Sequence, residues 1–296
     1  NNNNYCFFLR EAEYNESACH LKKRWFFLIF KEVVKMKKSK KDEQKLFGTE
    51  EWANYNVNCV TGCSHDCRYC YAKSMAIQYE RKTHDNWKDE VIRTKQLSKK
   101  FMKRKDGDRF MFPSTHDITP NNLSACIQIL THLLAPGNEG VIVTKPHFEC
   151  IEALCDVFPM FKDQFIFRFT IGSGNSETLR FWEPGAPDFE ERFTSLKYAH
   201  WKGYQTSVSC EPMLDDNIED VVEQVLPYVT ETVWIGKPNM LKGRLSMNGH
   251  DDEETMARAE SLLQSLSDQF IWDLYARYKD NSKIRWKDSI KKVVGD

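Results

Sequence analysis

Three cysteines lie close together in this chain, and their spacing constrains its fold and chemistry more than any other feature. They are Cys63, Cys67 and Cys70, in the arrangement C-x3-C-x2-C. Thiolates this close in sequence can share one small metal site. An iron–sulfur cluster that only carries electrons is normally held by four cysteines, so three cysteines leave one iron with open coordination positions. The spacing therefore indicates a metal centre that can bind a further molecule, as catalytic sites do.

Two simpler interpretations account for the triplet less well. A zinc site would need His65 as its fourth ligand, but His65 lies between the first two cysteines, so one short loop would have to supply all four ligands. The paired C-x2-C halves of common zinc modules are also missing from the sequence. A redox pair formed by Cys67 and Cys70 would leave Cys63 without a role. The iron–sulfur interpretation uses all three thiols.

The composition sets wide bounds on the fold and its partners. A chain of 296 residues with 41% hydrophobic content can bury one large core or two small ones. The net charge of −1 gives no general attraction to nucleic acid or to an anionic membrane, so a polyanionic partner would need a local basic patch. Seven further cysteines are scattered without a disulfide framework, and we therefore expect a cytoplasmic protein. The longest apolar stretch, Trp25–Phe30, is far shorter than the roughly 20 residues of a spanning helix, so we expect no membrane partner.

The sequence divides into three regions. Residues 1–50 are predicted to be an N-terminal extension, which starts with four asparagines and shows no pattern that connects it with the rest of the chain. Met36 opens a lysine-rich stretch, and one hypothesis is that Met36 is the physiological start and residues 1–35 are not native. Residues 51–240 are predicted to form the core, and residues 241–296 a helical extension.

From residue 55 onward, short apolar runs alternate with longer amphipathic stretches, which is the pattern of an α/β fold with a parallel sheet. Six β/α units are too few to close an eight-stranded barrel. Beyond residue 240, the acidic run 251–254 suits a helix N-terminus and predicts a helical cap. We expect strands at 55–60, 109–112, 140–144, 165–171, 205–209 and 232–235, and helices at 69–79, 122–134, 148–157, 189–201 and 218–226.

The cysteine spacing and Tyr71, the aromatic residue after the last cysteine, resemble the motif of the radical S-adenosylmethionine (SAM) superfamily. The segments Phe112–Asp117 and Trp182–Pro187 resemble its spore photoproduct lyase branch, over about residues 52–236. The resemblance implies a partial (β/α)6 TIM-like barrel with a C-terminal helical cap, and a site at the C-terminal ends of the strands. It also implies a [4Fe–4S] cluster and SAM as cofactors, and an external one-electron donor of the flavodoxin or ferredoxin type.

The resemblance further implies roles for single residues. Cys63, Cys67 and Cys70 would ligate the cluster. Tyr71 would lie near the adenine, Ser114 and Asp117 near the SAM ammonium and ribose, Lys145 near its carboxylate, and the Thr170 hydroxyl would bond SAM. Asp117 could instead only begin the following helix, since Asx residues favour such turns. Glu211, after the fifth predicted strand, is the candidate catalytic residue that contacts substrate or the SAM ribose, with loop capping as the alternative.

The implied activity is reductive cleavage of SAM to methionine and a 5′-deoxyadenosyl radical that abstracts hydrogen from a substrate that the sequence does not identify. In spore photoproduct lyase, a cysteine after the second strand donates the hydrogen atom that completes repair, and this chain has Phe112 there. We therefore expect a different substrate. Two alternatives stay open: a non-enzymatic iron–sulfur or zinc protein, and a radical SAM enzyme that acts on DNA or RNA. The basic run Lys99–Lys105 is expected to be a solvated helix end rather than a nucleic-acid patch.

Overall fold

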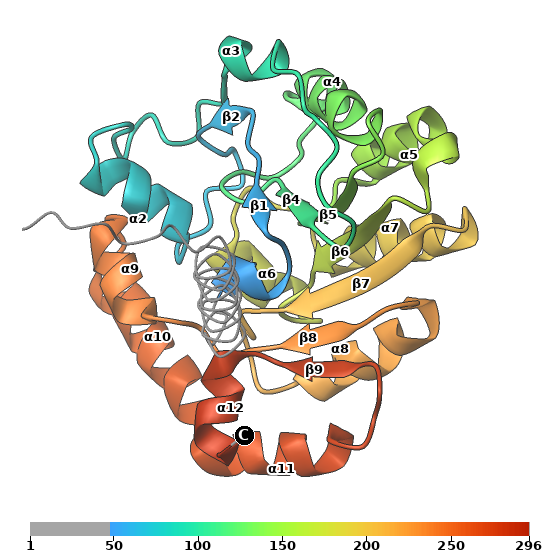
Figure 1. Cartoon of the computed structure of the whole chain (residues 1–296). Coiled ribbons are helices and arrows are strands. Elements are labelled where there is room, and N and C mark those ends of the chain that lie inside the picture. Colours follow the sequence, from blue (N-terminus) through green and yellow to red (C-terminus); the bar gives the residue numbers. More distant parts are fainter. Residues whose placement is uncertain (1–47, 296) are drawn as a thin grey trace, which may run out of the picture. The chain divides into compact units, whose positions relative to one another are not determined.

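The computed structural model describes residues 48–295, and within them seven strands form one parallel sheet (Figure 1). The strand order is β1-β4-β5-β6-β7-β8-β9, and every neighbouring pair is parallel. The hypothesis about Met36 and the apolar run near residue 25 lie outside the described residues. The strands are β1 (Tyr55–Asn56), β4 (Arg109–Phe112), β5 (Glu139–Thr144), β6 (Phe165–Thr170), β7 (Gln205–Cys210), β8 (Val233–Ile235) and β9 (Ile284–Trp286).

The helices that follow the strands cover the outer face of the sheet (Figure 1). Strand β6 lies in the middle of the sheet between β5 and β7, and all six of its residues are buried. A central parallel strand covered on both faces has this continuous burial. The helical elements up to β8 are η1 (Gly48–Glu51), α2 (Tyr71–Gln78), α3 (Thr94–Leu97), α4 (Leu123–Leu134), α5 (Phe148–Val157), η2 (Pro159–Phe161), α6 (Ser176–Trp182), α7 (Phe189–Trp201), α8 (Ile218–Val225) and η3 (Leu226–Tyr228).

The predicted α/β fold is confirmed, with one predicted strand divided in two. Of the predicted strand 55–60, only β1 belongs to the main sheet. After residues 57–59 the chain forms β2 (Val60–Thr61), which pairs antiparallel with β3 (Val91–Ile92). The side chain of Asn58, between β1 and β2, accepts hydrogen bonds from the backbone N–H groups of Ser114 and Thr115, both at 2.8 Å. The chain therefore turns from the sheet toward the loop after β4, where the predicted SAM contacts lie.

The C-terminal region contains the expected helices and one strand that was not predicted from the sequence. Its helices are α9 (Leu241–Met247), α10 (Glu253–Ser265), α11 (Asp268–Tyr278) and α12 (Asp288–Val294). Strand β9 joins the sheet beside β8, so Trp286 is buried. The basic run 99–105 is exposed, but it follows α3 without being helical. Within residues 48–295, none of the helices combines the length and the hydrophobicity that a membrane span requires.

Candidate functional site

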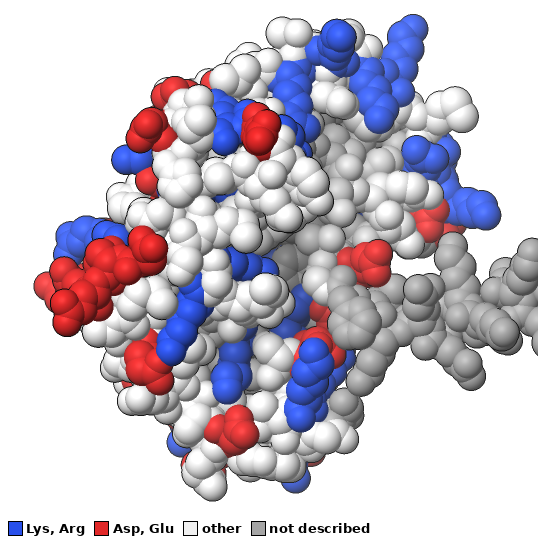
Figure 2. Space-filling model, turned by 90° about the vertical axis from the view of Figure 1, so that its left-hand side faces the viewer, with Lys and Arg blue, Asp and Glu red and all other residues white. Residues whose placement is uncertain are grey.

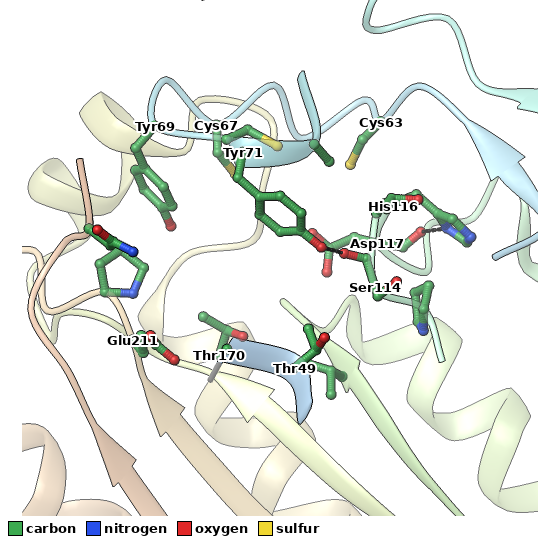
Figure 3. Close-up of a pocket in the computed structure, with 18 of the residues that line it drawn as sticks. Thr49, Cys63, Cys67, Tyr69, Tyr71, Ser114, His116, Asp117, Thr170 and Glu211 are labelled. Atoms are coloured by element: carbon green, nitrogen blue, oxygen red, sulfur yellow. Dashed lines mark hydrogen bonds between the residues drawn. The ribbon is translucent and has the colours of Figure 1, made fainter. Parts of the chain in front are cut away.

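A cavity of about 780 Å³ lies at the C-terminal ends of the parallel strands. Figure 3 shows side chains from several strand ends and from the cysteine loop pointing into it. The cavity brings together every predicted site residue, although these residues span almost 150 positions of the chain. They are Cys63, Cys67, Cys70, Tyr71, Ser114, Asp117, Lys145, Thr170 and Glu211.

The cysteine loop is fixed by its own backbone and side chains. Gly62 has φ +95°, and a Cβ atom there would overlap backbone oxygens of the loop that ends in β3, so only glycine fits before Cys63. Lys73 on α2 reaches back to Asp66 inside the loop, with 2.8 Å between Nζ and Oδ1, and both side chains are buried. Cys70 is the N-cap of α2, and its Sγ accepts from the backbone N–H of Lys73 at 3.4 Å.

The three thiols suit an iron–sulfur cluster. Burial raises the pKa of the Cys63, Cys67 and Cys70 thiols, so a thiolate here requires a cation beside it. The eight cysteines within residues 48–295 are all free, so no disulfide competes for these sulfurs. Figure 3 shows the Cys63 and Cys67 side chains directed at the same space. Three thiols that line one cavity are a donor set suited to a cluster with one open iron.

A second metal-binding arrangement overlaps this one. One ligand atom each from Cys63, His65 and Asp117 lie within 4.8 Å of one another. However, both ring nitrogens of His65 face close neighbours: Nε2 lies 2.9 Å from Nε2 of His147, and Nδ1 lies 3.0 Å from Asp117 Oδ2, although without hydrogen-bond geometry. His65 would have to leave these contacts to bind a metal. Its observed role is to connect the cysteine loop with the loops after β4 and β5.

Asp117 and Lys145 form a buried ion pair at one end of the cavity. Lys145 Nζ lies 3.5 Å from Asp117 Oδ2, and Asp117 Oδ1 accepts from the Lys145 backbone N–H at 2.7 Å. Although burial alone would raise the pKa of Asp117, the charges of Lys145 and His65 hold it well below its usual value. The Asp117 carboxylate is thus ionised and has a close ion pair and a hydrogen bond, both with Lys145. It keeps the Lys145 ammonium charged beside the predicted SAM site.

Two of the other predicted SAM contacts meet at the same end. Tyr71, which is 40% exposed, donates its hydroxyl hydrogen to the backbone oxygen of Ser114. The Ser114 hydroxyl accepts from the Asn58 amide at 2.8 Å. Thr170 ends β6 at the floor of the cavity, as Figure 3 shows. Ser114 and Thr170 therefore add polar groups to the cavity lining, and Tyr71 lies beside the cysteine loop.

The segment Trp182–Pro187 packs against the cysteine loop and is hydrogen-bonded to it. The Trp182 carbonyl accepts from the Arg68 N–H at 2.9 Å, and the Gly185 N–H donates to the His65 carbonyl at 3.0 Å. Glu183 is fully buried, and its Oε2 lies 2.5 Å from Nη2 of Arg192. Burial by itself would raise the pKa of Glu183, but the Arg192 guanidinium holds it below its usual value. This ion pair fixes the segment Trp182–Pro187 in the protein core.

The C-terminal region holds the cysteine loop from the other side. Asn248, in the turn between α9 and α10, is 1% exposed. Its Nδ2 donates to the carbonyls of Arg68 at 2.8 Å and Cys70 at 3.0 Å, and its Oδ1 accepts from the Ser74 hydroxyl at 2.8 Å. Asn248 was not among the predicted residues, because a single asparagine so far along the chain from the loop carries no local signal.

Glu211, the predicted catalytic carboxylate, lies at the opposite end of the cavity from Asp117 (Figure 3). Burial raises its pKa, against the charge of Lys287. Lys287 Nζ lies 3.3 Å from Glu211 Oε2 and also contacts the carboxylate of Glu51. Lys287 was not predicted either. The apolar-polar-apolar pattern of 284–286 just before it is too short to predict a strand end by itself.

Phe112 occupies the position at which the resembling lyase has its hydrogen-donating cysteine. Its side chain is 1% exposed and packs edge-to-face against His116, with ring centroids 6.0 Å apart. Phe112 is not part of the cavity wall, and the cysteines that line the cavity within residues 48–295 are the three of the loop. The described part of the cavity therefore offers no thiol besides the predicted cluster ligands.

Comparisons with known proteins identify the fold. No protein-family model matches the chain. The architecture is that of the radical SAM partial barrel: a spore photoproduct lyase single mutant matches with a TM-score of 0.52 at 14% identity, over 82% of this chain and 79% of the other. A double mutant of the lyase with bound AdoMet and dinucleoside spore photoproduct matches with a TM-score of 0.50 at 15% identity, over 77% of this chain and 67% of the other.

Two further matches complete the comparison. Another lyase mutant, with dinucleoside spore photoproduct, has a TM-score of 0.48, and this chain spans 64% of its length. In sequence, the chain is 26% identical over 230 residues to an uncharacterized protein of Acidianus two-tailed virus, covering 73% of this chain and 72% of the relative. The two matches with TM-scores of 0.52 and 0.50 confirm the expected resemblance at the level of the fold.

Proposed function

We propose that this chain is a radical SAM enzyme. The observation that carries the proposal is that the Cys63, Cys67 and Cys70 thiols line one cavity at the C-terminal ends of parallel strands, together with Ser114 and Asp117. Chemistry in such barrels takes place on this face. The AdoMet-bound lyase structure of similar fold supports the same assignment.

The residues of the chain have separable roles in this proposal. The three cysteines would hold a [4Fe–4S] cluster, which when bound would supply one electron to SAM and release methionine and a 5′-deoxyadenosyl radical. Lys145 presents a charged ammonium to the SAM carboxylate, and Asp117 keeps that ammonium charged and in place. Thr170 and Ser114 offer hydroxyl groups, and the buried walls keep water from the radical. Glu211 contacts the substrate at the far end.

The test is SAM cleavage. The protein is reconstituted anaerobically with iron and sulfide, reduced with dithionite and mixed with SAM, and 5′-deoxyadenosine is measured by mass spectrometry. From the unaltered chain we expect the visible absorbance of an iron–sulfur cluster and the formation of 5′-deoxyadenosine. From Cys67→Ala we expect neither. Cys150→Ala is the matched control, because Cys150 is a buried thiol on α5 that does not line the cavity. A fully loaded cluster that yields no 5′-deoxyadenosine would refute the proposal.

A zinc protein is the second candidate, favoured by the proximity of Cys63, His65 and Asp117. Metal analysis of protein purified without oxygen separates the two candidates. About one equivalent of zinc per chain, lost in His65→Ala but kept in Cys70→Ala, would support the zinc site. Iron and sulfide that are lost in Cys70→Ala would support the cluster.

The partners can be inferred from the chemistry. The cluster would need a one-electron donor, for which we propose a flavodoxin or ferredoxin of a reducing compartment, the cytoplasm. DNA or RNA is a candidate substrate, which the lyase with dinucleoside spore photoproduct supports. Figure 2 shows lysine and arginine side chains around a hollow on one face of the molecule, with aspartate and glutamate side chains among them. The affinity for oligonucleotides is measured at several salt concentrations. An affinity that falls with salt, with a slope that corresponds to several phosphate contacts, would support this substrate class, and an affinity independent of salt would count against it.

A further inference from the structure

The cavity wall beyond Glu211 is built by the segment that follows β8. Lys237, Pro238 and Asn239 line the cavity directly after the strand, and Leu241 and Arg244 of α9 continue the wall. Loops at this position determine what a barrel of this kind binds, because they close over the strand ends. This wall therefore comes from a different part of the chain than the loops that carry Asp117 and Lys145.

Arg244 is a cation that the described chain leaves without an acceptor. It is half-buried, and its guanidinium carbon lies 5.9 Å from the centre of the Tyr71 ring. Within residues 48–295, its guanidinium makes neither a salt bridge nor a hydrogen bond to another residue, whereas the buried Arg168 and Arg192 each pair with a glutamate. A guanidinium has five donors, and a partly buried one without acceptors is costly.

The nearby carboxylates are already engaged. Glu211 lies 3.3 Å from Lys287, which also contacts Glu51, and the ammonium of Lys237 lies 3.8 Å from Asp268. Burial lowers the pKa of Arg244, against the partial compensation of Cys70, Glu211 and the tyrosines that face it. Within residues 48–295 no carboxylate is therefore left for Arg244, and its guanidinium is open to an acceptor on a molecule in the cavity.

We propose that Arg244 binds an oxyanion of the substrate, a phosphate or a carboxylate, in the part of the cavity between Tyr71 and Glu211. Planar guanidinium groups bind both oxyanions in a two-pronged fashion, and a ring beside the guanidinium holds it in place. The SAM carboxylate is expected beside Lys145, which has its own counter-ion in Asp117. The assignment to substrate rests on the proposed function, but the presence of an oxyanion site does not.

The experiment measures anion and SAM binding separately, in the full chain with its cluster reconstituted. Inorganic phosphate and acetate are titrated by calorimetry or by NMR, with Arg244→Gln, Arg244→Lys and Arg277→Gln as variants. Arg277 is an exposed arginine of α11 that pairs with Glu219, and it serves as the control. We expect Arg244→Gln to weaken binding of the preferred anion about tenfold to a hundredfold, Arg244→Lys to weaken it less, and Arg277→Gln to leave it unchanged. Preference for phosphate over acetate identifies the substrate group as phosphate, and the reverse preference as carboxylate.

Three results would overturn the proposal. The first is equal anion binding by the unaltered chain and Arg244→Gln, and the second is no binding of either anion up to about 100 mM. The third is a tenfold or larger loss of SAM affinity in Arg244→Gln, which would assign the guanidinium to SAM instead. Failure of the proposed function looks different, because the unaltered chain would then form no 5′-deoxyadenosine whatever its anion affinity.

Discussion

The contact between Asn248 and the cysteine loop yields a prediction whose size can be worked from the structure. Asn248→Ala removes two hydrogen bonds that Nδ2 donates to the Arg68 and Cys70 carbonyls and one that Oδ1 accepts from Ser74. The Cys70 carbonyl keeps the backbone N–H of Ser74 at 3.1 Å, whereas the Arg68 carbonyl loses its amide donor. One buried acceptor left unpaired and two lost bonds together cost about 2–6 kcal/mol.

The assay has two readouts, both on the cluster-free chain. Denaturant unfolding gives the loss in free energy of unfolding, and the rate of Cys70 alkylation by iodoacetamide, measured by mass spectrometry, reports the local opening of the loop. Leu274→Ala is the matched control, because Leu274 is buried on α11 and its truncation costs a similar amount, about 2–5 kcal/mol, without touching the loop. Ser74→Ala should cost only about 0.5–1.5 kcal/mol.

We expect Cys70 to react faster in Asn248→Ala than in Leu274→Ala at equal global stability, while the buried Cys150 reacts alike in both. Because the thiols are measured without a cluster, this result does not depend on the proposed activity. A loss of stability below about 1 kcal/mol would refute the reasoning, since it lies under the cost of the single unpaired carbonyl. Equal Cys70 rates in the two variants would show that Asn248 stabilises the fold but does not position the loop.

Three further predictions concern the site. Lys145→Ala should weaken SAM binding about tenfold to a hundredfold while the cluster absorbance stays, and loss of the absorbance would contradict its placement. Gly185→Ala would push its Cβ into the Ser64 carbonyl oxygen, so cluster yield should fall although the helix content in circular dichroism is kept. Because Arg192 depresses the pKa of Glu183 in the folded chain, this pair stabilises above the unfolded value of about 4.3, and the stability is lost as pH falls through the folded value. The free energy of unfolding of Glu183→Gln should therefore fall less steeply below about pH 4.3 than that of the unaltered chain. Parallel curves of unfolding free energy against pH for the two proteins would count against the ion pair.

Those parts of the fold that repeat a local pattern could be predicted from the sequence. The helices at 148–157 and 189–201 and the strand at 109–112 lie where their apolar periods predicted them. Strand β9 escaped because three residues carry too little pattern, and it forms only because β8 offers a free edge beside it. The split of the first strand depends on Asn58, whose partners lie more than 50 positions away.

The residues of the candidate site also divide into those that a local pattern predicted and those that it missed. Residues next to strand ends or inside the cysteine motif were predicted, because a parallel sheet brings the ends of its strands together. Arg244, Asn248 and Lys287 were missed, because each reaches the site from the C-terminal region through contacts that no spacing rule encodes. The predicted roles of Asp117 and Glu211 toward SAM and substrate stay predictions.

Lys287 has a consequence for the order in which the site is made. It donates to the Gly48 carbonyl at 3.1 Å, a contact between residues 239 positions apart, and contacts Glu51 and Glu211 at the same place. On the ribosome, the cysteine loop emerges more than 200 residues before this lysine. The three thiols therefore exist while the Glu211 end of the cavity still lacks its last wall. Contacts of such separation form late in folding, so the thiols are accessible in the nascent chain before the cavity around them is complete.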